Sequence, residues 1–193
     1  EEEKESILPV IRNIREQSSI PISVDTRKSK VAEAALDNGA DVINDISALQ
    51  DDPELSMLAA KRKVPVVLMH MKGTPKDMQK APEYKNAVEE IYAALSEFKE
   101  NAVKAGIDKN RIIVDPGIGF GKRVEDNLAI IKNVSKFTEL GPVLIGASRK
   151  SFIGSVLGRD VDSRLPGTIV VHTLAALQGA AVLRVHDVQA AAD

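Results

Sequence analysis

The sequence predicts an α/β fold in which parallel β-strands alternate with helices. Short runs rich in Val and Ile are apolar throughout rather than at every second residue, which is typical of strands buried on both faces of a parallel sheet. Segments with helical spacing separate these runs. Six runs of this kind occur, and each closes on a polar residue: 21–26, 42–47, 64–70, 112–117, 143–149 and 182–186.

Helical segments lie before the first run and between the others. The first helix is expected at roughly residues 2–17. Asp52 and Pro53 predict a later helix start, because an Asp side chain caps free N–H groups and proline suits the first helical position. The segment 84–105 predicts the clearest helix, with an apolar stripe at spacings of three and four. That stripe consists of Val88, Ile91, Leu95, Phe98 and Ala102.

Three glycines mark helix ends that precede a strand. The position that ends a helix often needs a positive φ, which glycine adopts without a Cβ clash. These residues are Gly39, Gly106 and Gly179. The positions of these glycines therefore support the same alternation of helices and strands as the apolar runs.

Strict alternation leaves an open doubly wound sheet or a closed eight-stranded barrel. A doubly wound nucleotide-binding sheet has a glycine-rich turn after its first strand, and the turns DTRKSK and ISALQDD contain no glycine. Polar strand ends favour the (β/α)8 TIM barrel. Six strands do not close such a barrel. We therefore expect 1–193 to be a single domain that lacks the first two βα strands and ends in a shortened helix after 187.

Composition narrows the possible partners and compartments. The 193 residues are 44% hydrophobic and 28% charged, which is typical of one globular domain. A net charge of -2 gives no electrostatic reason to expect nucleic acid or an anionic membrane. The absence of cysteine excludes disulfides and thiolate chemistry. No apolar run is long enough to span a bilayer, and the acidic start is unlike a signal peptide, so we expect the cytoplasm.

Polar residues at the strand ends are the candidates for binding and catalysis. A barrel brings such residues to one mouth although they are distant in sequence. Carboxylates and amides suit a planar heterocycle rich in N–H groups, whereas Lys, Arg and His suit its carbonyl and an anionic group. The candidates are Asp25, Asn44, Asp45, His70, Asp115, Arg149, Lys150, Arg184, His186 and Asp187.

Each candidate also has a structural interpretation. A strand-end carboxyl or amide often only caps the next helix or satisfies loop backbone. This alternative applies to Asp25, Asn44, Asp45 and Asp187. His70, between two methionines, is as consistent with a packed rim position as with a ligand contact. His172 lies among apolar residues in the middle of a predicted helix, and we interpret it as structural.

The segment DPGIGFGK at 115–122 is the most specific local feature. Pro116 fixes φ after the strand, and three glycines allow the backbone to approach a ligand closely. Phe120 is suited to stacking on a flat ring. A phosphate-binding loop is the alternative, but Asp115 would repel an anion and the spacing fits neither GxGxxG nor Walker A. The segment GASRKSF at 146–152 adds two cations after a strand, with a solvated basic turn as the alternative.

Six motifs occur in one order along the chain: SVDT (23–26), INDIS (43–47), VLMHMKGTPKDMQ (67–79), DPGIGFGK (115–122), GASRKSFIG (146–154) and RVHDV (184–188). Over essentially the whole chain they resemble dihydropteroate synthase. The resemblance implies condensation of 6-hydroxymethyl-7,8-dihydropterin diphosphate with p-aminobenzoate, giving 7,8-dihydropteroate and diphosphate in folate biosynthesis. The alternatives are a methyltetrahydrofolate methyltransferase, which SRKS and RVHDV disfavour, a non-catalytic pterin-binding relative and an unrelated barrel.

The resemblance implies a pterin pocket built from several strand ends. Asp115 matches the residue that binds the pterin 2-amino and N3 edge, and Lys150 matches the one at carbonyl O4 and N5. The other implied pterin-binding residues are Asp25 at the N8 side, Asn44 at the neighbouring ring nitrogens, and Met69 and Gly119 along the slot.

The same resemblance implies the two remaining subsites. Phe120, Lys150 and Ser151 match the p-aminobenzoate pocket, where sulfonamide inhibitors are also expected to bind. Arg184 and His186 match the diphosphate pocket. The implied catalytic residues are Asp25, Lys150, Arg184 and His186.

Mg²⁺ is the implied cofactor, and the family places its ligand in an N-terminal loop that does not occur in this sequence. We therefore expect no metal ligand in this chain. The loop that helps close the p-aminobenzoate site is also missing, so the chain is expected to be incomplete for catalysis. Ile118 stands where the family often has an aromatic residue. A homodimer formed through the last helices is implied, and the Ala-rich stretch 168–183 permits it.

Overall fold

The computed structural model describes residues 2–73 and 82–193, so part of the motif at 67–79 lies outside the described residues. The chain divides into two compact units. Unit 1 comprises Glu1–Met69 and Glu97–Ile113, and unit 2 comprises His70–Ser96 and Val114–Asp193. Helix α4 (Ala87–Lys104) and strand β4 (Ile112–Asp115) contribute residues to both units. The expectation of a single domain stays a prediction.

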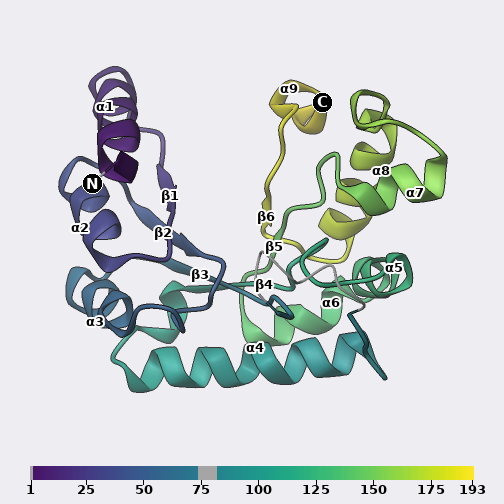
Figure 1. The fold of residues 1–193 in the computed structure, drawn as a ribbon, viewed down its shortest axis with the longest axis horizontal. Helices are drawn as coiled ribbons and strands as arrows, with labels where there is room; N and C mark the ends of the chain where they lie inside the picture. Colours follow the sequence, from purple (N-terminus) through teal and green to yellow (C-terminus); the bar gives the residue numbers. More distant parts are fainter. Residues whose placement is uncertain (1, 74–81) are drawn as a thin grey trace. The chain divides into compact units, whose positions relative to one another are not determined.

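Unit 1 alternates helices with parallel strands (Figure 1). The sheet order is β1-β2-β3-β4, and the β1–β2 and β2–β3 pairs are parallel. The register sets Asp25 opposite Asn44. Besides its parts of α4 and β4, the unit contains α1 (Glu2–Gln17), β1 (Ser23–Asp25), α2 (Ser29–Asp37), β2 (Val42–Asp45), α3 (Pro53–Arg62), β3 (Val66–Met69) and the 3₁₀ helix η1 (Lys109–Arg111).

Apolar residues of helix and strand form the core of unit 1. Ile11 of α1, Val24 of β1 and Ala35 of α2 are buried in one cluster, with Ile7 packed against it. Helices α1 and α2 lie side by side in Figure 1, and they contact one another. The helix expected at 2–17 is confirmed as α1.

The predicted start of α3 is also confirmed. Asp52 is the N-cap, and its Oδ1 accepts a hydrogen bond from the Glu54 backbone N–H at 3.0 Å. Pro53 occupies the first helical position. Among the predicted helix ends, Gly39, Gly106 and Gly179 have φ values of 105°, 96° and 93°, as expected.

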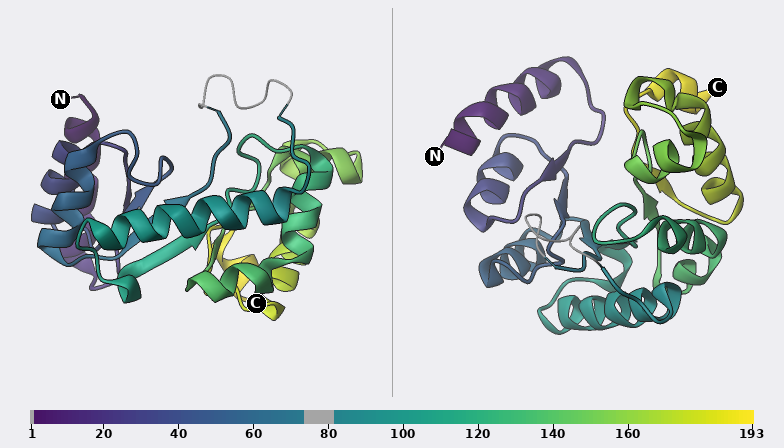
Figure 2. Two further views of the ribbon diagram at one scale, coloured as in Figure 1. Left: turned by 90° about the horizontal axis from the view of Figure 1, so that it is seen from below. Right: turned by 45° about the vertical axis from the view of Figure 1, so that its right-hand side comes forward.

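Unit 2 continues the alternation with shorter strands. The end of β4 bridges to Val143 in the parallel sense, and β5 pairs in parallel with β6. Figure 2 shows the green helices of this unit packed together, and α8 contacts α5 and α7. The remaining elements are α5 (Val124–Lys132), α6 (Val134–Phe137), η2 (Thr138–Leu140), β5 (Leu144–Ile145), α7 (Ser151–Leu157), η3 (Val161–Ser163), α8 (Leu165–Leu177), β6 (Val182–Leu183) and α9 (Val188–Ala192).

The order of neighbouring strands distinguishes the two architectures considered from the sequence. A doubly wound sheet reverses its strand order at a switch point. Among the described residues β1 to β4 follow in sequence, Val114 of β4 bridges to Val143, and β5 pairs with β6. Consecutive parallel neighbours joined by helices are the arrangement of a β/α barrel. The predicted fold class is therefore confirmed at the level of strand order.

Two predicted strands are shorter than expected for a physical reason. The run at 143–149 forms strand only over Leu144–Ile145, because the Ala147 N–H turns to His172 Nε2 at 3.2 Å. The run at 182–186 forms strand only over Val182–Leu183. There the His186 N–H donates to the Ser148 hydroxyl at 3.2 Å. In both runs side chains replace the sheet as hydrogen-bond partners.

Candidate active site

Asp115 closes β4 and begins the glycine-rich loop of unit 2. The residue is 7% exposed, and its Oδ1 accepts a hydrogen bond from the Gly117 N–H at 2.7 Å. Burial raises the pKa of Asp115, whereas the Gly117 N–H, Lys150, Lys122 and Arg184 act in the opposite direction. A buried carboxylate that faces three cations is typical of a binding site rather than of a packed core.

The glycines let this loop lie against the segment that follows β3. Gly117 has a φ of 71°, and a Cβ built on it would stand 1.9 Å from the His70 carbonyl oxygen. A Cβ on Gly121 would stand 2.3 Å from the Lys72 carbonyl oxygen. No side chain fits at either contact. The glycines therefore serve the close packing of two backbone segments.

Replacing Gly117 with Ala is expected to destabilise the protein. The left-handed conformation alone costs a residue with a Cβ about 1–2 kcal/mol, and the clash with His70 adds to that. Gly158 is a matched control because its φ is 63° and nothing lies within 4 Å of a Cβ built there. Urea unfolding should show a larger loss of unfolding free energy for Gly117→Ala than for Gly158→Ala. Equal losses would show that the close backbone contact is absent.

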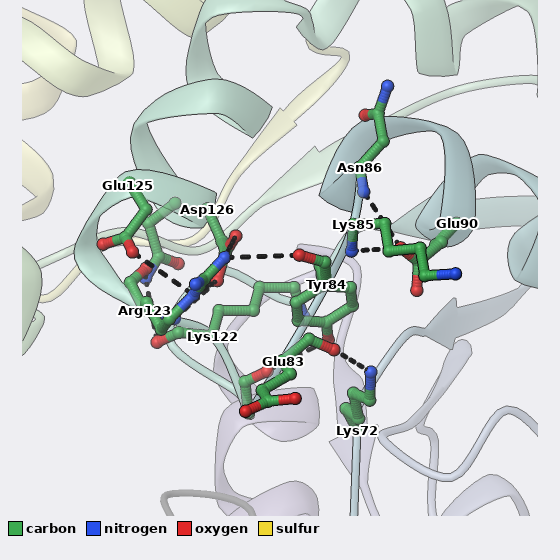
Figure 3. Close-up of polar contacts among 12 residues, drawn as sticks. Lys72, Glu83, Tyr84, Lys85, Asn86, Glu90, Lys122, Arg123, Glu125 and Asp126 are labelled. Atoms are coloured by element: carbon green, nitrogen blue, oxygen red, sulfur yellow. Dashed lines mark hydrogen bonds and ion pairs between the residues drawn. The ribbon is translucent and has the colours of Figure 1, made fainter. Parts of the chain in front are cut away.

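Side chains from three parts of unit 2 hold the loop in place. The Asn127 Oδ1 accepts from the Gly119 N–H at 2.7 Å, and the Tyr84 hydroxyl donates to the Gly121 carbonyl at 3.0 Å. Figure 3 shows the Lys122 side chain running toward Tyr84 beside the Arg123–Asp126 pair. In that pair Arg123 Nε donates to Asp126 Oδ2 at 2.8 Å. The contacts of Asn127 and Tyr84 thus satisfy backbone groups at two positions of the loop.

Lys150 follows β5 and reaches the same loop. Its Nζ donates to the Ile118 carbonyl oxygen and lies 4.3 Å from the centre of the Phe120 ring. A Cβ on Gly119 would stand 2.8 Å from Lys150 Cδ, so that glycine makes room for the side chain. Burial lowers the pKa of Lys150 to about 8, although Asp115 acts in the opposite direction. The carboxylate and the ammonium thus belong to one site.

The backbone before Lys150 is held in an unusual conformation. Arg149 has a φ of 55°, which is uncommon for a residue other than glycine. Its N–H donates to the Thr168 hydroxyl at 3.0 Å, and its carbonyl accepts from Arg164 Nη1 at 3.0 Å. Its side chain pairs with Asp187 at 2.9 Å. Strain that the surroundings maintain in this way is characteristic of functional sites.

Arg184 and His186 follow β6, and both are exposed. The Arg184 N–H donates to the Ile145 carbonyl at 3.0 Å, and its charge acts on both Asp115 and Lys150. His186 Nδ1 lies 2.9 Å from the Ser148 hydroxyl. Arg184 therefore adds a cation to the carboxylate and the ammonium, and His186 lies two residues further along the same segment.

In unit 1 the structure brings together two of the predicted residues. Asn44 Nδ2 donates to Asp25 Oδ2 at 3.1 Å, across the β1–β2 register. Asp45 is fully buried and accepts from the Ser47 N–H at 2.8 Å and the Leu49 N–H at 2.7 Å, so its structural interpretation holds. Met69 ends β3 and is 3% exposed.

The remaining predicted residues fall into two kinds. Ser151 is exposed at the first position of α7, and Phe120 is partly buried beneath Lys150. His172 is 2% exposed and accepts from the Ala147 N–H, which agrees with its structural interpretation. His70 is likewise buried, and its ring is 6.2 Å from that of Tyr84, so it belongs to the packing of the site.

The sequence reasoning assigned no role to Ser148, Lys122 or Asn127. Ser148 and Lys122 lie inside the motifs GASRKSF and DPGIGFGK, where a polar residue next to a candidate ligand is the only available signal. Asn127 follows the glycine-rich loop within α5 and carries no motif of its own. All three act on other residues of the site, which a linear pattern does not reveal.

Comparisons with known proteins show the family of this chain. The family model described as "Pterin binding enzyme" matches residues 1–186. The dihydropteroate synthase of Haemophilus influenzae is 42% identical over 194 residues, covering all of this chain and 70% of the relative.

Two solved structures show the same likeness. The dihydropteroate synthase of Xanthomonas albilineans in complex with 7,8-dihydropteroate has a TM-score of 0.91 and 43% identity, covering 98% of this chain and 70% of that one. The enzyme of Yersinia pestis with a sulfonamide drug has a TM-score of 0.92 and 38% identity, covering 96% and 67%.

Fold and site together define a pterin-binding enzyme of the β/α-barrel class. The coverage and the sequence identity of these matches then narrow this class to one family. It belongs to the dihydropteroate synthase family, the transferases of folate biosynthesis. The resemblance drawn from the six motifs is confirmed, and the methyltransferase and unrelated-barrel alternatives are not supported.

Proposed function

We propose that the unit 2 site binds the pterin in the dihydropteroate synthase reaction, with Asp115 on its 2-amino and N3 edge. The observation that carries this proposal is the buried Asp115 carboxylate beside Lys150. A carboxylate accepts from two neighbouring N–H groups in a charge-assisted pair, and an ammonium donates to a ring carbonyl. We assign Lys150 to pterin O4 and N5 and Gly119 to the ring face. From the family resemblance we also propose pterin contacts for Asp25, Asn44 and Met69.

In the proposed reaction the C–O bond to diphosphate breaks and a C–N bond to p-aminobenzoate forms, while the amine releases one proton. The aniline nitrogen is neutral at pH 7, so a strong base is not needed to activate it. The site acts by placing positive charge where the leaving group gains negative charge, and by holding the amine near the reacting carbon. Arg184 and His186 are assigned to the diphosphate. Asp25 and Lys150 are assigned to the pterin ring, whose charge changes as the bond to diphosphate breaks.

We assign the p-aminobenzoate pocket to Phe120, Lys150 and Ser151. Lys150 lies over the Phe120 ring, so an aromatic carboxylate at this place would meet both an apolar face and a cation. The same chemistry suits a sulfonamide, which we propose as an inhibitor of this chain. A synthase of this family is known with a sulfonamide drug.

Arg184→Ala tests the assignment of the diphosphate subsite. The variant is expected to weaken binding of the pterin diphosphate by about tenfold or more, because a charge-assisted hydrogen bond is worth about 1.5–3 kcal/mol. Binding of the bare pterin alcohol should change much less. Calorimetry with both compounds makes the comparison, and the exposed Arg111 gives a control variant, Arg111→Ala. Equal losses for the two compounds would remove Arg184 from the anion site.

Magnesium remains a proposal that the described residues do not support directly. Among residues 2–73 and 82–193 no group of three or more His, Asp or Glu side chains can hold a metal ion. Mg²⁺ often relies on one or two carboxylates together with substrate phosphates. The proposed steps involve no metal. Binding of the pterin diphosphate with and without added Mg²⁺, measured by calorimetry, is the direct test.

We also propose a cytoplasmic homodimer. In the described part of the chain, no helix has both the length and the apolar character that membrane crossing requires. Helix α8 exposes apolar side chains at Val170, Leu174 and Leu177, the last of them 80% exposed. Such a run supports an interface between two copies. Sedimentation of the purified protein tests the state of association.

A further inference from the structure

Lys122 carries a buried ammonium group that has no part in the contacts proposed so far. The residue is 5% exposed. Its Nζ lies 2.9 Å from the Phe120 carbonyl oxygen, 3.3 Å from the His70 carbonyl oxygen and 3.1 Å from His70 Nδ1. An ammonium has three donors, and these three acceptors engage all of them. The geometry is that of a protonated lysine and a neutral histidine whose Nδ1 accepts.

The ammonium bonds to two backbone segments, the one that follows β3 and the glycine-rich loop that begins at Asp115. His70 follows β3 and donates its N–H to the Asp115 carbonyl at 2.9 Å, whereas Phe120 belongs to the glycine-rich loop. A Cβ built on Gly117 would stand 3.3 Å from Lys122 Nζ, so the ammonium lies close to that glycine. One group thus ties His70 to the loop at whose head Asp115 stands.

The charged groups around Lys122 come from several elements. Asp115 of β4 and Asp126 of α5 favour its charged form, whereas Lys150 opposes it. Burial is the largest effect and lowers the pKa of Lys122 to about 7. Burial and the charges of Lys122 and Lys72 also lower the pKa of His70 to about 3, so this ring stays neutral.

Lys122 differs from the other cations near Asp115 in what it contacts. The proposed function places Lys150 on the pterin and Arg184 on the diphosphate, so both change partners when substrate arrives. Lys122 is held by protein acceptors instead, so below its pKa of about 7 its charge acts on Asp115 whether or not substrate is present. Lysine is almost never fully buried unless it is paired, and the groups that pair with Lys122 belong to the two segments on either side of it.

We propose that Lys122 is a positioning residue for the pterin, in that its buried ammonium fixes the glycine-rich loop against His70 and is a counter-charge for Asp115 that protein acceptors hold in place. The inference rests on the proposed role of Asp115 in binding the pterin. It makes Lys122 responsible for two properties of that carboxylate: where it points and the pH range in which it is ionised.

The test is Lys122→Met in the full chain, with calorimetry of 6-hydroxymethyl-7,8-dihydropterin over a series of pH values. Below the pKa of Asp115, pterin affinity is expected to fall about tenfold for each pKa unit by which the loss of the cation raises that pKa. The acid limb of the binding profile should move to higher pH, because Asp115 loses a cation that lowers its pKa. Lys122→Arg should restore the position of that limb.

Lys132→Met is the matched control, because it removes a lysine from the exposed surface of α5. If Lys122→Met does not fold, Lys122→Gln takes its place, since it keeps N–H donors without the charge. An unmoved acid limb in the variant would overturn the proposal. The role of Asp115 is tested separately. If Asp115→Asn binds the pterin normally, the proposed function fails. If Asp115→Asn loses pterin affinity but the Lys122 variant binds as Lys132→Met does, only the inference about Lys122 is overturned.

Discussion

Replacing Asp115 with Asn is expected to remove most of the affinity for the pterin. The carboxylate offers two acceptors to two N–H groups, and an amide would turn one acceptor into a donor that faces a donor. A buried mismatch of this kind costs about 1–3 kcal/mol, or roughly ten- to hundredfold in the dissociation constant. Because Asp115 is only 7% exposed, water offers little compensation. Calorimetry with 6-hydroxymethyl-7,8-dihydropterin measures the loss.

The pH dependence gives an independent check on the same residue. Burial raises the pKa of Asp115, and only the ionised form accepts from both N–H groups. Pterin affinity should therefore be full above the raised pKa and fall as the pH drops through it. Asp115→Asn should show no such acid limb. Asp160→Asn changes an exposed aspartate of the same unit and should bind as the unmodified chain does. Near-native binding by Asp115→Asn would refute the assignment.

Lys150→Met is expected to weaken the pterin and to slow turnover together. The ammonium donates to a ring carbonyl in the proposed complex, and a charge-assisted hydrogen bond contributes about 1.5–3 kcal/mol. Burial lowers the pKa of Lys150 to about 8, so binding in the unmodified chain should decline as the pH rises through that value. The variant should lack this alkaline decline. Kinetics and calorimetry over a pH series provide both readings.

The folding stability of the Lys150→Met variant should depend on pH in a different way from its pterin binding. The folded-state pKa of about 8 lies below the ordinary 10.5, so the unfolded chain binds more protons between these two pH values. In that window stability rises with pH in the unmodified chain. Lys150→Met should reduce this rise, and the lowered pKa of Lys122 accounts for the part that remains. Lys104→Met, on the exposed end of α4, is the control. A variant that lost stability at pH 7 but bound pterin normally would make Lys150 a structural residue.

The parts predictable from sequence are those that depend on local pattern. The stripe through Ile91 and Leu95 predicted α4, and the Asp52–Pro53 pair predicted the start of α3, because cap chemistry and helical spacing are short-range properties. The glycine-rich loop was predicted to let the backbone approach a ligand closely, whereas the structure sets Gly117 and Gly121 against another backbone segment. Its partner, the backbone of His70, is about fifty residues away and leaves no local trace.

The contacts that organise the site lay beyond sequence reasoning for the same reason. Ser148 and His186 are 38 residues apart, and Lys122 and His70 are 52 apart. Such pairs are set by strand order and register, which place the ends of distant strands together. A strand-end list finds the groups that face a ligand, but it does not distinguish them from Asp45, whose carboxylate satisfies its own loop.

The contact between His186 and Ser148 fixes both the backbone and the ring of the histidine with one hydroxyl. The Ser148 hydroxyl accepts from the His186 backbone N–H at 3.2 Å and lies 2.9 Å from His186 Nδ1. The two nitrogens of an imidazole lie on different edges of the ring, so a contact at Nδ1 directs Nε2 away from Ser148. A histidine held in this way presents one ring nitrogen to a ligand in a set direction. Ser148 would therefore orient the imidazole that is assigned to the diphosphate without touching the diphosphate itself.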